Sequence, residues 1–519
     1  MKTVKIYDTT LRDGTQAEGI SLSLNDKLKI AKRLDQFGIH YIEGGWPGSN
    51  PKDMAFFKEV KKLKLKHSKV AAFGSTRRPH TKASEDANIK ALLKAQTDVI
   101  TAFGKSWNLH VTDVFKTSLK ENLEMIFDTV KYLKTRRKEV IFDAEHFFDG
   151  YLADSKYAIE AIKAAISAKC DLVCLCDTNG GMLPSQMRDI IKRVGQEVSV
   201  PLGIHCHNDS DLAVSNSIVA VEEGCVHVQG TINGIGERCG NANLVSIIPL
   251  LNLKMGLRAV SSSKLKELTE MSRYVYEICN LPIDHAKPFV GKSAFAHKGG
   301  VHVNAMMKNP ETYEHIKANL VGNKTRFLVS ELSGKTNILL KAQELDINLD
   351  KETPETKKVL FKIQDLENQG YQFEAAEASF ELLLKKALGQ YRSFFEICCF
   401  STCVEKREDG KVLTGATVKV KVKDKVELTA GEGDGPVNAL DNAFRKALSK
   451  FYPVINKIHL VDYKVRVIDS DAGTAAKVRV FVQFRDDKDD WTTVGVSENI
   501  IEASWNALVE AIEYKLLKG

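Results

Sequence analysis

Short apolar runs rich in β-branched residues alternate with amphipathic stretches through the first half of the chain. Eight such runs lie between residues 4 and 254, and the stretches between them repeat apolar residues at helical intervals of three and four. We predict strands at 4–7, 41–43, 70–73, 99–103, 139–143, 172–176, 202–205 and 226–231, and helices at 26–37, 122–133, 157–168, 185–194 and 212–222. Strands that alternate with helices pair in parallel. Eight units favour a closed (β/α)₈ TIM barrel, because an open doubly wound sheet usually has about five or six strands.

The pattern changes beyond residue 260. Two strong helical stretches, at 351–368 and 373–387, lie in a mixed region that we assign to linker subdomains, residues 261–390. The final part has strands predicted at 418–422, 463–467 and 478–484 and helices at 438–450 and 498–517, an arrangement typical of a small α/β domain. We therefore predict a catalytic barrel at 1–260, the linker subdomains at 261–390 and a separate C-terminal domain at 391–519.

Composition excludes several classes of protein. The 519 residues are 43% hydrophobic and 27% charged, as in ordinary globular proteins. No apolar signal core or membrane-spanning run is present, so we expect a soluble, cytoplasmic protein. The ten cysteines lie mostly in apolar runs and are predicted to be reduced structural thiols. The net charge of +7 is slight, and the basic runs at 61–66 and 134–138 fall where helices should end, which disfavours a nucleic-acid surface.

The candidate chemistry gathers where the predicted strands end. Catalytic groups of a TIM barrel come from the carboxyl ends of its strands and from the loops that follow them. Polar side chains of this kind follow strands 1, 5, 6, 7 and 8, namely Arg12, Asp13, Glu145, Thr178, His205, His207 and Asn241. The later glycine pattern, Gly234-x-Gly236, is not interpreted as a dinucleotide loop, because it follows the eighth strand and lacks the third glycine and the downstream acid.

A metal site is predicted at this rim. His205 and His207 are two residues apart on extended backbone, so both imidazoles point to the same side. Asp13 can complete a set of two histidines and one carboxylate that leaves positions open for substrate, and Asn241 can add an oxygen ligand. The alternative is that the histidines only hydrogen-bond to loops.

The neighbouring polar residues each have a functional and a structural interpretation. Arg12 can stabilise a developing enolate or alkoxide, or else form a surface ion pair. Glu145 can transfer a proton, or else cap a loop at a strand end. Thr178 can bind a substrate carboxylate, or else serve an ordinary turn.

Three segments, 11–16, 205–209 and 234–243, resemble the signature of the 2-isopropylmalate, homocitrate and citramalate synthases, which are metal-dependent barrels related to hydroxymethylglutaryl-CoA lyase. Segments 432–440 and 500–504 resemble the dimeric C-terminal regulatory domain of those synthases. The resemblance implies an acyltransferase that condenses acetyl-CoA with a 2-oxo acid and converts the acyl group to alkyl on transfer. It implies a divalent metal (Mg²⁺, Mn²⁺ or alternatively Zn²⁺) on Asp13, His205 and His207 with Asn241 beside them. It also places Arg12, Glu145 and Thr178 around the oxo acid.

Segments 142–151 and 175–181 resemble the branch of this family that makes (R)-citramalate from pyruvate for isoleucine biosynthesis. The family implies a homodimer in which the linker subdomains of one subunit complete the partner's active site. They would supply a histidine that acts as the catalytic base, His302 or alternatively His297. It also implies feedback inhibition, with isoleucine bound near residues 469–475. The alternatives within the family are 2-oxoisovalerate (2-isopropylmalate synthase) and 2-oxoglutarate (homocitrate synthase). Outside it they are a non-haem iron oxygenase and a non-catalytic amino-acid sensor.

Overall fold

A computed structural model describes residues 2–328, 342, 354–468, 470–487 and 489–519. The chain divides into two compact units, which are described separately. The first comprises Met1–Phe295 and Glu314–Thr325, and the second comprises Ala296–Tyr313 and Arg326–Gly519. The predicted division into three parts, at 260 and 390, stays a prediction.

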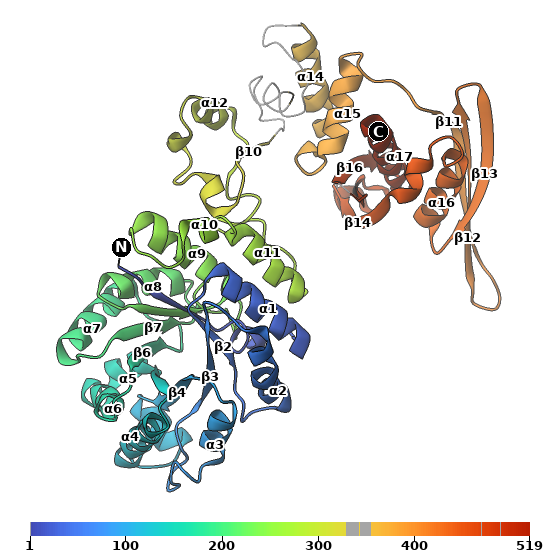
Figure 1. Cartoon of the computed structure of the whole chain (residues 1–519). Helices are drawn as coiled ribbons and strands as arrows, with labels where there is room; N and C mark the ends of the chain where they lie inside the picture. Colours follow the sequence, from blue (N-terminus) through green and yellow to red (C-terminus); the bar gives the residue numbers. More distant parts are fainter. Residues whose placement is uncertain (1, 329–341, 343–353, 469, 488) are drawn as a thin grey trace. The chain divides into compact units, whose positions relative to one another are not determined.

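The first unit is built on a closed barrel of eight parallel strands in sequence order (Figure 1). The strands are β1 (Lys5–Asp8), β2 (Tyr41–Gly45), β3 (Lys69–Ser75), β4 (Val99–Lys105), β5 (Glu139–Glu145), β6 (Leu172–Asp177), β7 (Leu202–Cys206) and β8 (His227–Gly230). The barrel closes where β1 pairs with β8 in parallel. All eight predicted strands are present, and the predicted TIM barrel is confirmed.

Helices surround this barrel. They are α1 (Leu24–Phe37), α2 (Pro51–Val60), α3 (Ala87–Lys94), α4 (Leu119–Thr135), α5 (Phe147–Ala153), α6 (Ser155–Ser167), α7 (Pro184–Glu197) and α8 (Ala213–Glu222). Local sequence sets their ends: α1 begins with a capping box between Ser23 and Asp26 and ends at Gly38, whose φ of 95° lies in the left-handed region. Their apolar faces pack on the outside of the strands to form the main core.

Three further helices follow β8 in the first unit, namely α9 (Leu244–Pro249), α10 (Ser262–Leu265) and α11 (Leu268–Ile278), and the last two lie past residue 260. Arg33 of α1 forms ion pairs with Glu267 and with Glu270 of α11, at 3.1 Å in each case. The basic runs fall at the ends of α2 and α4, as the sequence indicates. None of the helices in the described ranges is long and apolar enough to cross a membrane.

The second unit starts with short elements and a helical pair. These are β9 (Ala296–His297), α12 (Gly300–Lys308), β10 (Arg326–Phe327), α14 (Pro354–Asn368) and α15 (Glu377–Ala387). The helix predicted at 351–368 begins outside the described residues, and its described part is α14. The stretch predicted at 373–387 is a short turn, Phe373–Ala375, followed by α15.

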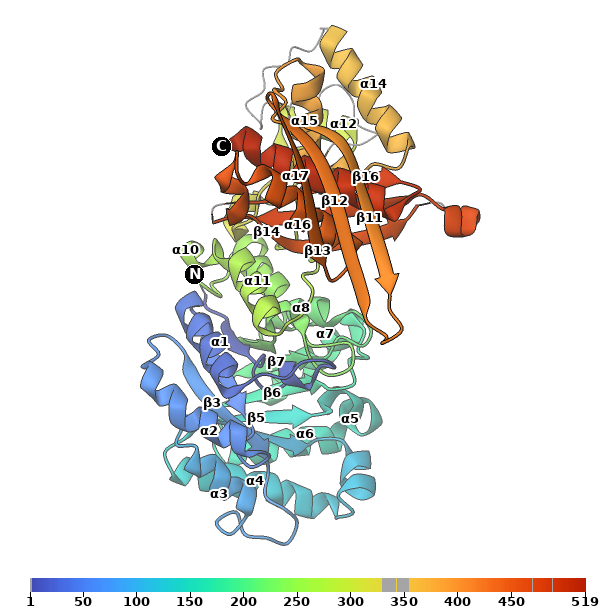
Figure 2. The ribbon, with the colours of Figure 1, turned by 90° about the vertical axis from the view of Figure 1, so that its right-hand side faces the viewer.

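The C-terminal part contains two successive antiparallel sheets of three strands, each followed by a helix. They are β11 (Glu396–Lys406), β12 (Val412–Val422), β13 (Lys425–Gly433) and α16 (Pro436–Leu448), then β14 (His459–Val467), β15 (Val478–Arg485), β16 (Asp490–Ser497) and α17 (Ile500–Lys518). Figure 2 shows β11 and β12 running side by side. Alternate residues of β12, including Val418 and Val420, are buried in the core that its helices cover. The predicted strands lie in β12, β14 and β15, whereas β11, β13 and β16 were not predicted.

All ten cysteines are free, as expected, but only six are buried. Cys239, Cys398, Cys399 and Cys403 are exposed. The expectation of buried thiols therefore holds for six cysteines of the first unit and fails for Cys239 and for the three cysteines of β11, a strand whose side chains are largely exposed.

Candidate metal centre

Three side chains from the first and seventh strands meet at the carboxyl end of the barrel. Asp13 follows β1, His205 lies in β7, and His207 follows that strand directly. Nε2 of His205 lies 3.5 Å from Oδ2 of Asp13, and Nε2 of His207 lies 3.9 Å from the same oxygen. One ligand atom from each residue lies within 4.8 Å of the others. The structure thus brings the three predicted ligands together.

Asn241 is held beside them by a glycine-rich loop after β8. Its backbone forms a bridge with His207, and its N–H donates to the carbonyl of Gly234. A Cβ at Gly236 would lie 2.1 Å from Nδ2 of Asn241, and a Cβ at Gly240 would lie 2.1 Å from the oxygen of Gly234. The absence of a side chain at Gly236 and Gly240 therefore allows the loop to fold tightly enough to place Asn241 beside the histidines.

The side chains present fit a divalent cation. Oδ1 of Asp13 and Oδ1 of Asn241 are buried and have no hydrogen-bond partner among the residues that the structure describes. A buried acceptor without a partner costs about 1–3 kcal/mol, so such atoms in a native site call for an explanation. Two imidazoles with carboxylate and amide oxygens suit ions such as Mn²⁺ or Zn²⁺, and the oxygens suit Mg²⁺.

The protonation states also suit metal binding. Burial lowers the pKa of His205 to about 3, with a further contribution from His207. Burial likewise lowers the pKa of His207. Burial alone would raise the pKa of Asp13, but Arg12 and the two histidines together lower it below its usual value. At neutral pH the site therefore offers two neutral imidazoles and one carboxylate, the forms that bind metals.

Arg12 is fixed in place beside the three ligands. Its Nε donates to Oε1 of the buried Glu43 at 2.5 Å, and its Nη1 lies 3.3 Å from Oδ2 of Asp13. Its guanidinium carbon lies 3.9 Å from the centroid of the Phe73 ring. Burial opposes its charge, but Glu43 and Asp13 raise the pKa of Arg12 above its usual value. Arg12 is therefore a permanent cation in a defined orientation at the barrel mouth.

Glu145 and Thr178 lie at the ends of the neighbouring strands β5 and β6. Glu145 forms an ion pair with Lys105, the last residue of β4. Oγ1 of Thr178 accepts a hydrogen bond of 2.9 Å from the backbone N–H of His146. The hydroxyl hydrogen of Thr178 thus remains available to a further acceptor.

The two candidate base histidines belong to the second unit. His302 lies on α12, where its ring stacks on that of Tyr313 with centroids 4.1 Å apart. His297 lies in β9 and is largely buried. The structure thus describes these histidines within their own unit, and their pairing with the barrel site stays a prediction.

Sequence reasoning missed three buried groups around this site. Glu43 is the middle residue of β2 and orients Arg12; it is also the last residue of the strand predicted at 41–43, so the rule of polar residues at strand ends would have selected it. Gln229 and Asp143 hydrogen-bond to each other in the barrel interior at 3.0 Å. Their signal is weaker, because a polar residue within a barrel strand does not reveal what it faces across the barrel.

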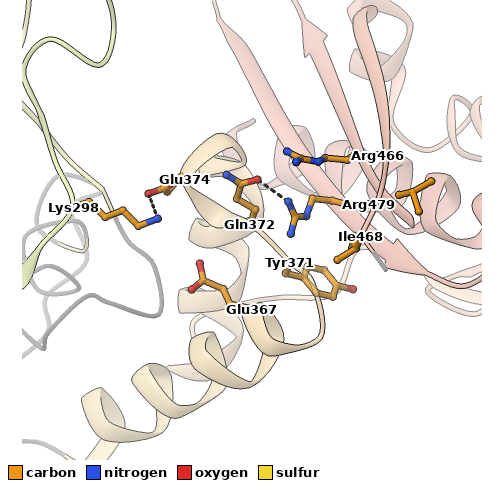
Figure 3. Close-up of a pocket in the computed structure, with 9 residues that line it drawn as sticks. Lys298, Glu367, Tyr371, Gln372, Glu374, Arg466, Ile468 and Arg479 are labelled. Carbon is orange, nitrogen blue, oxygen red and sulfur yellow. Dashed lines mark hydrogen bonds and ion pairs between the residues drawn. The ribbon is translucent and has the colours of Figure 1, made fainter. Parts of the chain in front are cut away.

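A separate cavity of about 390 Å³ lies in the second unit (Figure 3). Arg466 of β14 and Arg479 of β15 are neighbours in the strand pairing, and Figure 3 shows Lys298 on the opposite side. Lys298 pairs with Glu374 at 3.0 Å. Ile468, also in the lining, adjoins the predicted effector segment at 469–475, of which residue 469 and the side chains of 470–472 lie outside the described residues.

Comparison with known proteins matches three successive segments of the chain to known families. Residues 3–275 match the HMGL-like family, residues 289–371 match the homocitrate synthase post-HMGL domain-like family, and residues 374–516 match the LeuA allosteric (dimerisation) domain. The first match spans the barrel and the metal centre. The chain therefore belongs to the HMGL-like family.

Full-length relatives narrow the assignment. The chain is 57% identical to an (R)-citramalate synthase of Geobacter sulfurreducens over 100% of this chain and 98% of the relative. It is 54% identical to an (R)-citramalate synthase of Aquifex aeolicus over 99% and 98%, and 30% identical to a 2-isopropylmalate synthase of Methanocaldococcus jannaschii over 99% and 95%. These matches confirm the predicted family and the acyltransferase type of enzyme.

Proposed function

We propose that the protein condenses acetyl-CoA with pyruvate and water to give (R)-citramalate and free CoA. The observation that carries this proposal is the full-length identity with (R)-citramalate synthases, together with a site whose ligand atoms meet at the barrel mouth. In this reaction the acetyl methyl carbon bonds to the ketone carbon of pyruvate. Water then cleaves the thioester, and CoA leaves as the thiol. We further propose that the product enters a pyruvate route to isoleucine through 2-oxobutanoate.

Asp13, His205 and His207, with Asn241 beside them, would hold the divalent ion. When bound, the ion supplies a Lewis acid for the carboxylate and ketone oxygens of the oxo acid. The chain supplies the remaining electrostatics: Arg12 lies next to Asp13 and provides a fixed positive charge for an alkoxide or enolate oxygen.

Two further side chains and the partner's histidine complete the proposed site. Thr178 offers its hydroxyl hydrogen to the substrate carboxylate, and Glu145, held by Lys105, serves proton transfer. His302 of the partner subunit would remove a proton from the acetyl methyl group, with His297 as the alternative base. The match to the LeuA dimerisation domain supports the homodimer that this arrangement requires.

An aromatic wall beside Arg12 supports a small oxo acid. Phe73 and Phe103 stack with centroids 5.0 Å apart, and Trp46 meets Phe103 edge-on at 5.4 Å. Nε1 of Trp46 donates to Asn88 at 2.6 Å, which fixes the indole. Because Arg12 packs directly on Phe73, an oxo acid bound to Arg12 would lie near these rings, and we propose that they limit the size of its substituent. A methyl group fits such a wall better than an isopropyl or carboxyethyl group.

The direct test measures release of free thiol from acetyl-CoA by the purified protein with Mn²⁺ or Mg²⁺. We expect the largest kcat/KM with pyruvate, and His207→Ala should abolish release. The same assay with 2-oxoisovalerate and 2-oxoglutarate distinguishes the 2-isopropylmalate and homocitrate alternatives. A larger kcat/KM with either acid would refute the assignment to pyruvate, and oxygen uptake without thiol release would favour the oxygenase alternative.

We propose that isoleucine inhibits the enzyme by binding in the C-terminal unit, at the cavity of Figure 3. Arg466 can bind a carboxylate, Glu374 can bind an ammonium group, and Ile468 lines the cavity with apolar surface. Arg466→Ala should weaken isoleucine binding measured by calorimetry. Lys464→Ala is the matched control, because Lys464 is a cation of the same strand outside the cavity. Equal affinity in the wild type and Arg466→Ala would exclude this cavity as the isoleucine site.

We also propose a cytoplasmic location, because that is where we expect acetyl-CoA and pyruvate.

A further inference from the structure

A buried carboxamide connects one candidate metal ligand to the barrel interior. Gln229 lies in β8 and is 0% exposed. Its Oε1 lies 3.0 Å from Nδ1 of His205, and its Nε2 donates to Oδ1 of Asp143 at 3.0 Å. Asp143 lies in β5, so the chain of contacts runs across the barrel from β5 through β8 to β7.

The contacts of His205 determine which ring nitrogen carries its proton. Nε2 is the atom that faces Oδ2 of Asp13 at 3.5 Å, so Nε2 must present its lone pair to an ion held there. A neutral imidazole then carries its proton on Nδ1, which must donate. Oε1 of Gln229 is an acceptor at hydrogen-bond distance from that nitrogen.

Asp143 determines which way the carboxamide of Gln229 points. Oδ1 of Asp143 accepts the N–H of the amide at 3.0 Å, which leaves Oε1 of Gln229 facing Nδ1 of His205. Nδ1 of His207, by contrast, is buried without a hydrogen-bond partner in the described part of the chain. The orienting contact is therefore specific to one of the two histidines.

We propose that Gln229, oriented by Asp143, is a positioning residue that holds His205 in the tautomer with Nε2 directed at the ion. Groups that accept the second N–H of a metal-bound histidine fix its ring orientation and basicity, and their loss typically costs about 10- to 100-fold in metal affinity. The inference rests on the metal centre of the proposed function. Its test therefore measures metal binding separately from turnover.

The experiment titrates Mn²⁺ alone into chelator-treated full-length protein and follows binding by calorimetry and by the EPR signal of free Mn²⁺. Gln229→Leu removes the acceptor and should weaken Mn²⁺ binding about 10- to 100-fold. Gln229→Glu keeps an acceptor for Nδ1–H and should bind Mn²⁺ more tightly than Gln229→Leu. Asp143→Asn no longer favours one orientation of the Gln229 amide, so its Mn²⁺ affinity should lie between those of the wild type and Gln229→Leu.

Asn216→Leu is the matched control. Asn216 is also a buried amide, 1% exposed, and it donates to the carbonyl of Met182 away from the ligands. It should lower the melting temperature without changing Mn²⁺ affinity. In the Co²⁺-substituted protein at saturation, Gln229→Leu should alter the visible absorption spectrum, whereas Asn216→Leu should not.

Three results would overturn the inference: unchanged Mn²⁺ affinity in Gln229→Leu, equal losses in Gln229→Leu and Gln229→Glu, or an equal loss in Asn216→Leu. The last two would indicate packing or global stability. Failure of the proposed function is distinguishable, because in that case the wild type itself would bind no Mn²⁺ at the site or would release no thiol with pyruvate.

Discussion

Gly236→Ala should damage the metal centre through a single steric contact. The added Cβ would lie 2.1 Å from Nδ2 of Asn241, where ordinary contacts begin at 3.4 Å. The φ of Gly236 lies outside the left-handed region, so alanine meets no backbone strain at this position. The contacted atom belongs to a short side chain whose backbone is fixed by hydrogen bonds to the loop, so Asn241 has little room to retreat.

The size of the effect follows from this geometry. The separation must grow from 2.1 to about 3.4 Å, a shift of about 1.3 Å. Metal–ligand distances tolerate about 0.2 Å, so Asn241 would no longer reach an ion held by the histidines. We expect Mn²⁺ affinity to fall about 10- to 100-fold, which corresponds to about 1.4–2.7 kcal/mol.

The assay is Mn²⁺ titration of the full-length protein, with thiol release measured in parallel. Gly181→Ala is the matched control, because a Cβ at Gly181, in the loop after β6, would meet no atom within 4 Å. A double-mutant cycle with Asn241→Ala isolates the contact, because Gly236→Ala should have no further effect once the side chain of Asn241 is gone. Wild-type affinity in Gly236→Ala, or an equal loss in the Asn241→Ala background, would refute the reasoning.

Three other changes test separate parts of the structure. Phe73→Ala opens the aromatic wall and should raise the ratio of kcat/KM for 2-oxoisovalerate to that for pyruvate about 10- to 100-fold; an unchanged ratio would mean that the wall does not bound the substrate. His302→Asn should lower thiol release about 100-fold or more while Mn²⁺ affinity stays the same; full activity would point to His297 instead. Burial raises the pKa of Glu510 to about 7, so the stability that its protonated form contributes below about pH 4.5 is lost as the pH rises through about 7. Glu510→Gln should therefore be more stable than the wild type at pH 8, by up to about 3 kcal/mol, and equal to it near pH 4.5. A difference in melting temperature between the two proteins that stays constant from pH 4.5 to 8 would contradict the raised pKa of Glu510.

The barrel could be predicted from sequence because each of its strands is buried between the core and a covering helix. Continuous apolar runs such as that of β6, broken by amphipathic helices, give a strong and repeated signal. The strands of the C-terminal part do not share this property. Most side chains of β11 are exposed, so neither an apolar run nor a regular alternation marks it. Alternate residues of β12 are buried against α16, and this regular alternation allowed part of the strand to be predicted.

Some residues of the candidate site could likewise be predicted from sequence, and others could not. Asp13, His205 and His207 could be found because a topological rule places strand ends at one rim, whatever the details of packing. Gln229 and Asp143 are 86 residues apart and meet only across the closed barrel, so no local pattern connects them. The role of Gly236 was equally hidden, because a glycine in sequence does not tell which side chain needs the space that it leaves.

The buried charges at the barrel mouth support a cation independently of the ligand geometry. Asp13, Glu43 and Asp143 are all nearly inaccessible to solvent, and Arg12 lies among them. Burial, together with the charge of Glu43, raises the pKa of Asp143 to about 8, and burial also raises the pKa of Glu43. Burying carboxyl groups in this way costs folding free energy. Natural proteins tend to retain such groups at functional sites. Asp13 pairs with Arg12 and partly neutralises it, and a divalent cation next to Asp13 would add the positive charge that an anionic oxo acid needs. We therefore expect the oxo acid to bind more tightly when the cation is present.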